Sequence, residues 1–299
     1  AVPCDLGGRP LGDALLTIVN TGDDFRHLGL TICPDIDSVL YALAGLSDPE
    51  RGWGRRDESW NFMAALRQLQ GPDWFQLGDA DLAMHVERTR RLAAGQTLSR
   101  ATDDLRRALG ITSRVLPMSD DPVATRLLTD EGWLAFQEYF VHRQCLPRVQ
   151  QIEFAGAAHA RSQPEALAAL ARPDLRAVVI CPSNPFVSIE PILALPGMRA
   201  ALQACAAAVV AVTPIIGGQA VKGPAAKMLR ELGCEVSGAG VAQRYEGLID
   251  AFISDESDGV SAPIEGIALH ATPTLMRSAA QREQLARAVL AVADSIRGG

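Results

Sequence analysis

Lysine is almost missing from this chain. Of the 28 basic residues, 26 are arginine, and the two lysines, Lys222 and Lys227, stand in one short segment, VKGPAAK. If arginine has replaced lysine wherever either cation is suitable, the two remaining lysines mark positions where a compact ammonium group has an advantage. A phosphate beside a glycine-flanked loop is one such position. Chance placement is the alternative explanation.

Other absences exclude whole classes of protein. The six cysteines form no CxxC pair and no zinc-type Cys/His spacing, which favours free thiols and a cytoplasmic location. A net charge of −7 and a pI near 5.3 supply no basic surface for nucleic acid or an acidic membrane. The longest apolar run stops at Pro214, short of the roughly 20 residues that cross a bilayer. We expect small-molecule substrates, no nucleic acid and no membrane.

Four apolar, β-branched segments predict buried strands, and each is followed by residues that end a strand. The segments are ALLTIVN, LRAVVIC, AAVVAVT and LIDAFIS, followed by TGDD, PSNP, PIIGG and DESD. Helix-period segments such as PEALAALARP and PAAKMLRELG lie between strands. This alternation predicts an α/β protein of parallel βαβ units, whose loops converge on a crevice beyond the carboxyl ends of the strands.

The middle of the chain has a different pattern. NFMAALRQL, ADLAMHVERTRRLAAG and SRATDDLRRALG have helical periodicity, and VATRLLT with WLAFQEYFV reads as a hairpin around DEG. We predict that residues 46–147 form an inserted, mostly helical subdomain with a β-hairpin. Residues 1–45 and 148–299 then form the nucleotide-binding core.

Two acidic clusters are the first candidate site. Asp23 and Asp24 follow the first predicted strand, and Asp35 and Asp37 follow in CPDID. With Asn20 and Thr21 nearby, they offer the oxygen ligands that suit Mg²⁺ together with substrate phosphates. The alternative is turn and helix-cap chemistry, which also favours Asp and Asn.

Two loops are candidates for holding a phosphate or a base. Ser183 and Asn184 lie between two prolines after a predicted strand, although a plain turn fits them equally well. Gly217 and Gly218 permit a close backbone approach ahead of a helix N-terminus, with Lys222 beside them. No Walker loop and no GxGxxG motif occurs.

The remaining candidates are a histidine and several aromatic residues. His85, in DLAMH, fits an acid/base group or a metal ligand, but a single histidine among apolar helix neighbours is more often structural. Trp53 and Trp60, in WGRRDESWNF, can stack on a flat ring or belong to the core of the helical segment.

Several long blocks together resemble the 2-phospho-L-lactate transferase family (CofD/FbiA) of coenzyme F(420) biosynthesis. They include IVNTGDDFRHLGLTICPDIDSVLYALAG, DWFQLGDADLAMH, ICPSNPFVSIEPILALPGMR and TPIIGGQAVKGPAAKM, in order along nearly the whole chain. The resemblance implies a Rossmann-like three-layer α/β/α fold with a mainly parallel sheet, a homodimer, and Mg²⁺ as cofactor.

The same resemblance implies an activity of the EC 2.7.8.28 type. A phospholactyl or phosphoenolpyruvyl group passes from a guanosine diphosphate-linked donor to the 5′-hydroxyl of the deazaflavin riboside Fo, and GMP is released. Lactate, enolpyruvate and glycerate donors differ by few contacts, so all three remain open. The alternative is a CofD-like regulatory protein that binds a nucleotide sugar and has no transferase activity.

The resemblance also assigns roles to residues. Asp23 and Asp37 match acidic positions that hold Mg²⁺ or the acceptor hydroxyl, and they are the expected catalytic pair. Trp53, Trp60 and Gln76 lie on the side that binds Fo, with Gln76 standing where many relatives carry Lys or Arg. The remaining candidates belong to the nucleotide side: Asn20, Thr21, Ser183, Asn184, Gly217, Gly218 and Lys222.

Family members begin with a strand and a glycine-rich loop of the type GGxGGxKL, ahead of the VNTGDD block. This chain starts with AVPCDLGGRP and does not show that pattern before its own VNTGDD. We expect from this difference an N-terminally shortened chain that binds guanine nucleotide weakly.

Overall fold

The computed structural model describes residues 12–258 and 263–297, and they fall into two compact units. The first unit comprises the chain up to Leu127 together with Glu131–Pro147 and Glu153–Ala166. The second comprises Leu128–Asp130, Arg148–Ile152 and the chain from Leu167 onward. The sequence difference from the family at the start of the chain involves residues 1–11, which lie outside the described residues.

The first unit is built around a short parallel pair of strands. Leu16 of β1 lies opposite Arg114 of β4, and Val19 opposite Pro117. Among the described residues, β4 is the only strand that pairs with β1, along one of its two edges. The elements in chain order are η1 (Gly12–Ala14), β1 (Leu16–Val19), β2 (Phe25–His27), β3 (Leu30–Ile32), α1 (Pro34–Ala44), α2 (Asn61–Gln68), α3 (Asp79–Ala93), α4 (Leu98–Ala108) and β4 (Arg114–Pro117).

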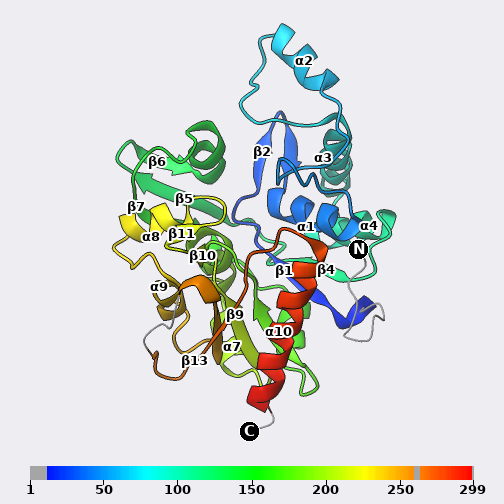
Figure 1. Cartoon of the computed structure of the whole chain (residues 1–299). Helices are drawn as coiled ribbons and strands as arrows, with labels where there is room; N and C mark the ends of the chain where they lie inside the picture. Colours follow the sequence, from blue (N-terminus) through cyan, green and yellow to red (C-terminus); the bar gives the residue numbers. More distant parts are fainter. Residues whose placement is uncertain (1–11, 259–262, 298–299) are drawn as a thin grey trace. The chain divides into compact units, whose positions relative to one another are not determined.

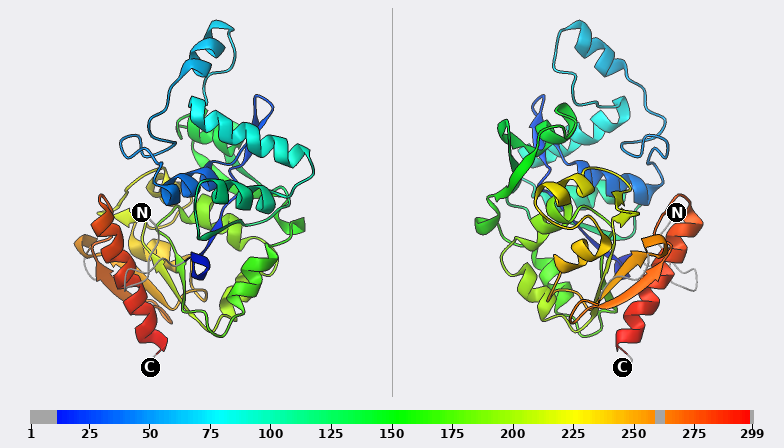
Figure 2. Two further views of the ribbon diagram at one scale, coloured as in Figure 1. Left: turned by 90° about the vertical axis from the view of Figure 1, so that its right-hand side faces the viewer. Right: turned by 60° about the vertical axis from the view of Figure 1, so that its left-hand side comes forward.

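Helices α1, α3 and α4 pack into one apolar core with β1 and β4. Leu40 and Tyr41 of α1 contact this core together with Met84 of α3 and Leu105 of α4, all of them buried. Gly45 ends α1 with a φ of 70°, the left-handed conformation that glycine adopts most easily. By contrast, α2 is joined to the rest of its unit by long loops on both sides (Figures 1 and 2).

The second unit contains a four-stranded parallel sheet in the order β13-β12-β9-β8. Three of the four predicted strands are β8, β9 and β12, whereas the fourth, β1, pairs with β4 in the first unit and β13 was not predicted. The elements of this unit are β8 (Ala177–Ile180), η4 (Pro185–Ile189), α6 (Glu190–Leu193), α7 (Met198–Gln203), β9 (Ala208–Val212), β10 (Ile215–Ile216), β11 (Gln219–Ala220), α8 (Ala225–Glu231), α9 (Gly238–Gln243), β12 (Ala251–Asp255), η5 (Glu256–Asp258), β13 (Ala268–Thr272) and α10 (Ala279–Arg297).

Alternating residues of these strands face opposite layers of helix. Val210 and Ile253 pack in one core with Val289 of α10, which lies along this face of the sheet (Figure 1). Phe252 points the other way, where a Cβ added to Gly238 of α9 would lie 3.5 Å from its ring. The sheet therefore has helices on both faces, which confirms the expected Rossmann-like α/β fold.

A further sheet has the strand order β6-β5-β7. Some of the residues in its strands are grouped with the first unit and others with the second. Its strands and the adjoining helical segments are β5 (Ala124–Thr129), β6 (Gly132–Ala135), η2 (Glu138–His142), β7 (Val149–Ala155), η3 (Ala157–His159) and α5 (Pro164–Leu170). Neighbouring β5 and β6 form the predicted hairpin, but the second strand ends at Ala135, and the rest of the segment predicted as strand is helical. The compact units group residues 12–45 with 46–127, whereas we expected 1–45 to join 148–299; the insertion itself stays a prediction.

Two expectations from composition can be compared with the structure. The five cysteines that it describes are all free thiols. Within residues 12–258 and 263–297, no helix has both the length and the apolar character needed to cross a membrane.

Candidate functional site

The acidic clusters come together because a hairpin reverses the chain between them. After β1, the side-chain oxygen of Asn20 accepts a hydrogen bond from the backbone N–H of Gly22 at 2.8 Å and forms a tight turn. Antiparallel β2 and β3 then return the chain to the first turn of α1, where Asp35 and Asp37 lie. The predicted grouping of the two acidic segments is therefore observed within one unit.

Asn20 joins the two clusters directly. Its side-chain nitrogen donates to Asp23 Oδ1 at 2.7 Å and to Asp35 Oδ2 at 3.0 Å. Burial and the neighbouring Asp35 charge raise the pKa of Asp23 well above its usual range. Burial also raises the pKa of Asp35 and of Asp24. One carboxylate oxygen of Asp24 is buried without a hydrogen-bond partner among the described residues.

These observations describe negative charge that the surrounding protein does not fully compensate. Carboxylates that share a site and lose water resist ionisation, which is the cause of the raised pKa values. A hard cation takes oxygen ligands of this kind and would remove the repulsion. The residues present therefore fit Mg²⁺ chemically, and Asp23 as its ligand stays a prediction.

Asp37 has a different environment from Asp23. Its carboxylate accepts hydrogen bonds from both terminal nitrogens of Arg88, one of them at 3.0 Å, and the other pair is in close contact. Arg88 is completely buried, and although burial lowers the pKa of a guanidinium, the Asp37 charge outweighs it and raises the Arg88 pKa. Asp37 is thus in two-point contact with a buried guanidinium.

His85 lies in the same buried cluster rather than in an apolar core. Its Nδ1 is 3.5 Å from Asp37 Oδ2 and its Nε2 is 3.2 Å from Asp81 Oδ2. Tyr41 donates its hydroxyl to Asp81 at 2.6 Å. Burial raises the Asp81 pKa, but the hydrogen bonds from His85 and Tyr41 outweigh this and leave the pKa lowered.

The sequence analysis did not single out Tyr41, Asp81 or Arg88. A signal for the last two exists, since Asp81, His85 and Arg88 are spaced i, i+4, i+7 and so lie on one face of α3. Asp37, Asp81 and His85 each offer a ligand atom within 4.8 Å of the others. The Arg88 guanidinium already contacts Asp37, and its positive charge opposes a metal cation at that carboxylate.

The expected acceptor side is also in the first unit. The Arg51 guanidinium lies 4.5 Å from the ring centre of Trp60 and 5.9 Å from that of Trp53, so both rings stack with a cation. Gln76 donates to the backbone oxygen of Asp73 at 2.6 Å, and its side-chain oxygen accepts from Arg67 at 3.0 Å. Gln76 is therefore held in place by its own loop.

A reciprocal pair of helix caps ties these loops together. Asp79, the first residue of α3, accepts from the backbone N–H of Phe62 at 2.9 Å near the start of α2. Glu58 accepts from the backbone N–H groups of Ala80 and Asp81, both at 2.8 Å. Hydrogen bonds from the Ser59 hydroxyl at 2.6 Å and from the Phe62 N–H lower the Asp79 pKa to about 2. The segment that carries Trp60 is thus fixed to the start of α3.

The predicted nucleotide loops lie in the second unit. The loops after β8, β9 and β12 leave the same edge of a parallel sheet, so three of the four predicted loops converge there. The side-chain oxygen of Asn184 caps the η4 segment by accepting from Phe186 N at 2.9 Å, and its nitrogen lies 3.3 Å from Met228 Sδ. Ser183 beside it is half-buried.

Gly217 and Gly218 form the turn of the small β10–β11 hairpin. Their φ angles are 59° and 70°, as a two-residue turn of type I′ requires, which accounts for glycine at both positions. The Gly217 N–H donates to Asp258. Lys222 follows the hairpin as an exposed residue, whereas Lys227 forms an ion pair with Glu231 at 2.7 Å.

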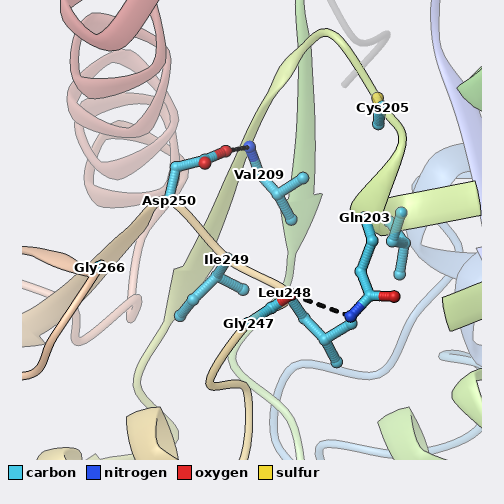
Figure 3. A pocket seen from close by; sticks show the side chains of 9 residues that line it. Gln203, Cys205, Val209, Gly247, Leu248, Ile249, Asp250 and Gly266 are labelled. Carbon is cyan, nitrogen blue, oxygen red and sulfur yellow. Dashed lines mark hydrogen bonds between the residues drawn. The ribbon is translucent and has the colours of Figure 1, made fainter. Parts of the chain in front are cut away.

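A pocket of about 210 Å³ lies elsewhere in the second unit (Figure 3). It adjoins the residues that precede β9 and β12, so it is at the amino ends of these strands and not at the predicted edge. Asp250 turns its carboxylate to the Val209 N–H at 2.7 Å, and Gln203 donates to Gly247 O at 3.3 Å (Figure 3). Its polar groups are occupied by these contacts, and none of the predicted site residues lines it.

Comparison with known proteins shows extensive similarity. The family profile described as "2-phospho-L-lactate transferase CofD" matches residues 7–267. The phosphoenolpyruvate transferase of Kitasatospora aureofaciens is 42% identical over 296 residues, which cover 96% of this chain and 92% of that protein. The phosphoenolpyruvate transferase of Mycobacterium tuberculosis (strain ATCC 25618 / H37Rv) is 39% identical over 286 residues, covering 92% and 85% respectively.

A solved structure shares the fold. The crystal structure of a UPF0052 family protein from Bacillus halodurans matches with a TM-score of 0.59 and 14% identity, covering 90% of each chain. At that identity the similarity concerns the fold alone.

Proposed function

The chain belongs to the CofD family of 2-phospho-L-lactate transferases, which act in coenzyme F(420) biosynthesis, and from this premise we propose that it uses the deazaflavin Fo as acceptor. The donor in this proposal is a guanosine diphosphate derivative of phosphoenolpyruvate, because the relatives at 42% and 39% identity are named phosphoenolpyruvate transferases. GMP is the second product. The acidic cluster around Asn20 is the structural observation that supports this reaction best.

The bond changes assign a different task to each carboxylate. The 5′-hydroxyl oxygen of Fo bonds to the phosphorus that carries the small acid, and the bond from that phosphorus to the GMP oxygen breaks. Asp37, oriented by its contact with Arg88, accepts the hydrogen bond of the hydroxyl and takes its proton as the phosphorus–oxygen bond forms. Asp23, with Asp35 and Asn20, has uncompensated negative charge and would hold Mg²⁺, which neutralises pyrophosphate charge when bound.

The binding sides follow from the same proposal. Trp53, Trp60 and Gln76 would contact the flat deazaflavin and its ribityl chain. The nucleotide would contact the polar residues predicted for it from the sequence, and we propose a homodimer as the assembled form. The nucleotide set comprises Asn20, Thr21, Ser183, Asn184, Gly217, Gly218 and Lys222.

Turnover with purified protein tests the function. Fo is supplied with guanylated phosphoenolpyruvate, phospholactate or phosphoglycerate, with and without Mg²⁺, and GMP is quantified. We expect the enolpyruvate donor to react fastest and EDTA to stop the reaction. The regulatory alternative predicts that Fo does not bind and that no donor is consumed.

Asp37→Asn tests the reaction centre. We expect turnover to fall by a factor of about 100 or more, within the range that general acid–base catalysis contributes. The free energy of unfolding should also fall by about 3 to 5 kcal/mol, because Arg88 loses its buried counter-charge. Wild-type turnover by the folded variant would exclude Asp37 from the reaction.

A further inference from the structure

Two helices of the first unit face each other through polar side chains where an apolar seam would be expected. Asp37 and Tyr41 lie one turn apart on α1, and Asp81, His85 and Arg88 lie along one face of α3. Two contacts cross between the helices, Tyr41 to Asp81 at 2.6 Å and Arg88 to Asp37 at 3.0 Å. Within α3, His85 Nε2 lies 3.2 Å from Asp81 Oδ2.

This arrangement is poorly explained by stability alone. A buried ion pair often contributes no more than well-packed apolar residues of the same size, because both charges lose their hydration. Arg88 has no exposed surface, and its Nε has no hydrogen-bond partner among the described residues. A cluster selected only to join two helices would not keep an unsatisfied buried donor.

What the cluster does achieve is a fixed carboxylate. The planar fork of an arginine contacts both oxygens of a carboxylate at once and so defines its plane, which a lysine cannot do. His85 Nδ1 lies 3.5 Å from Asp37 Oδ2, and its Nε2 lies 3.2 Å from Asp81 Oδ2. Tyr41 in turn donates its hydroxyl to Asp81. Asp37 can then present only its remaining lone pairs to a ligand.

We propose that Arg88 is a positioning residue for the transfer reaction: its two-point contact orients the Asp37 carboxylate toward the acceptor hydroxyl, and His85 and Asp81 support that orientation. The inference rests on the proposed function, in which Asp37 is at the reaction centre. Arg88 itself contacts no substrate, so its effect passes entirely through Asp37.

Arg88→Lys keeps the charge and removes the fork. We expect kcat to fall about 10-fold to 100-fold, the usual effect of losing a residue that orients a ligand-binding side chain, while KM for the guanylated donor stays unchanged. The matched control is Arg106→Lys, since Arg106 is equally enclosed in α4 and donates to Asp103 at 2.7 Å, away from Asp37. It should lose stability without loss of kcat in the folded protein.

A double-mutant cycle separates positioning from a purely structural role. If Arg88 acts through Asp37, then Asp37→Asn with Arg88→Lys is no slower than Asp37→Asn alone. Equal kcat values for Arg88→Lys and Arg106→Lys, or additive losses in the cycle, would overturn the inference about Arg88. The proposed function would still stand in that case, provided that the wild-type protein turns over. Wild-type protein inactive with every donor would instead overturn the proposed function.

Discussion

One side-chain nitrogen, that of Asn20, donates to two carboxylates, Asp23 at 2.7 Å and Asp35 at 3.0 Å. A neutral donor shared in this way reduces the repulsion between the two groups but adds no positive charge. The raised pKa values of both aspartates show that the repulsion and the loss of water persist. A cation bound between the two carboxylates would remove this repulsion.

Asn20→Asp tests this relationship with an isosteric change. The variant keeps the oxygen that accepts from Gly22 but replaces the donor by a third negative charge. We expect a lower thermal midpoint than wild type in EDTA and a larger increase on adding Mg²⁺. Gln70→Glu, at an exposed position, adds the same charge as a control. Equal Mg²⁺ responses in all three proteins would mean that no cation binds near Asn20.

The strands and the grouping of loops could be predicted because they depend on local pattern. β-branched runs such as AAVVAVT specify strands that are buried on both faces, and β9 is buried along its whole length. Parallel order then brings their carboxyl ends to one edge. Likewise, the two acidic clusters are separated by about a dozen residues, which a single hairpin brings together.

The pairing of Asp37 with Arg88 could not be predicted in the same way. The two residues are 51 positions apart, and their contact depends on how α1 and α3 pack. The β10–β11 hairpin was missed for another reason: strands of two residues have no periodicity to detect. The pair Gly217–Gly218 between II and QA was nevertheless a usable signal for a type I′ turn.

Asn184→Ala should affect nucleotide and acceptor differently. The change removes the cap of the η4 segment, at a cost of about 1 kcal/mol, together with a polar side chain at the carboxyl edge of the sheet. We expect weaker GDP binding and unchanged Fo binding in calorimetry. Thr97→Ala removes a cap from α4 in the other unit and should leave GDP affinity unchanged. Equal weakening of GDP and Fo by Asn184→Ala would indicate an effect on folding.

The two lysines make a matched pair for the nucleotide side. Lys222 is exposed, so Lys222→Met should weaken GDP binding by a factor of about 2 to 5, as expected for an exposed charge contact, and the difference should shrink at high salt. Lys227 pairs with Glu231, which also accepts from Val149 N at 2.9 Å, so Lys227→Met should change stability and not affinity. The opposite pattern would assign the phosphate contact to Lys227.

Asp255, at the end of β12, gives a pH dependence that is independent of the proposed reaction. Burial would raise its pKa, but hydrogen bonds from Ser257 and Thr274 outweigh burial and lower the pKa to about 2. Its folded value is below the ordinary 3.8, so its contribution to stability is complete above about pH 4 and is lost as the pH falls toward 2.

Asp255→Asn removes this titration and leaves the donors of Thr274 and Ser257 poorly matched, because an amide offers one acceptor oxygen where the carboxylate offers two. The variant should be less stable than wild type at pH 7, and in urea unfolding the stability gap should stay constant down to about pH 4 and narrow as the pH falls toward 2. Asp57→Asn, with a side chain 90% exposed, should show no such gap. A gap for Asp255→Asn that does not narrow at low pH would mean that the hydrogen bonds do not favour the ionised form, and that the loop after β13 is held by packing instead.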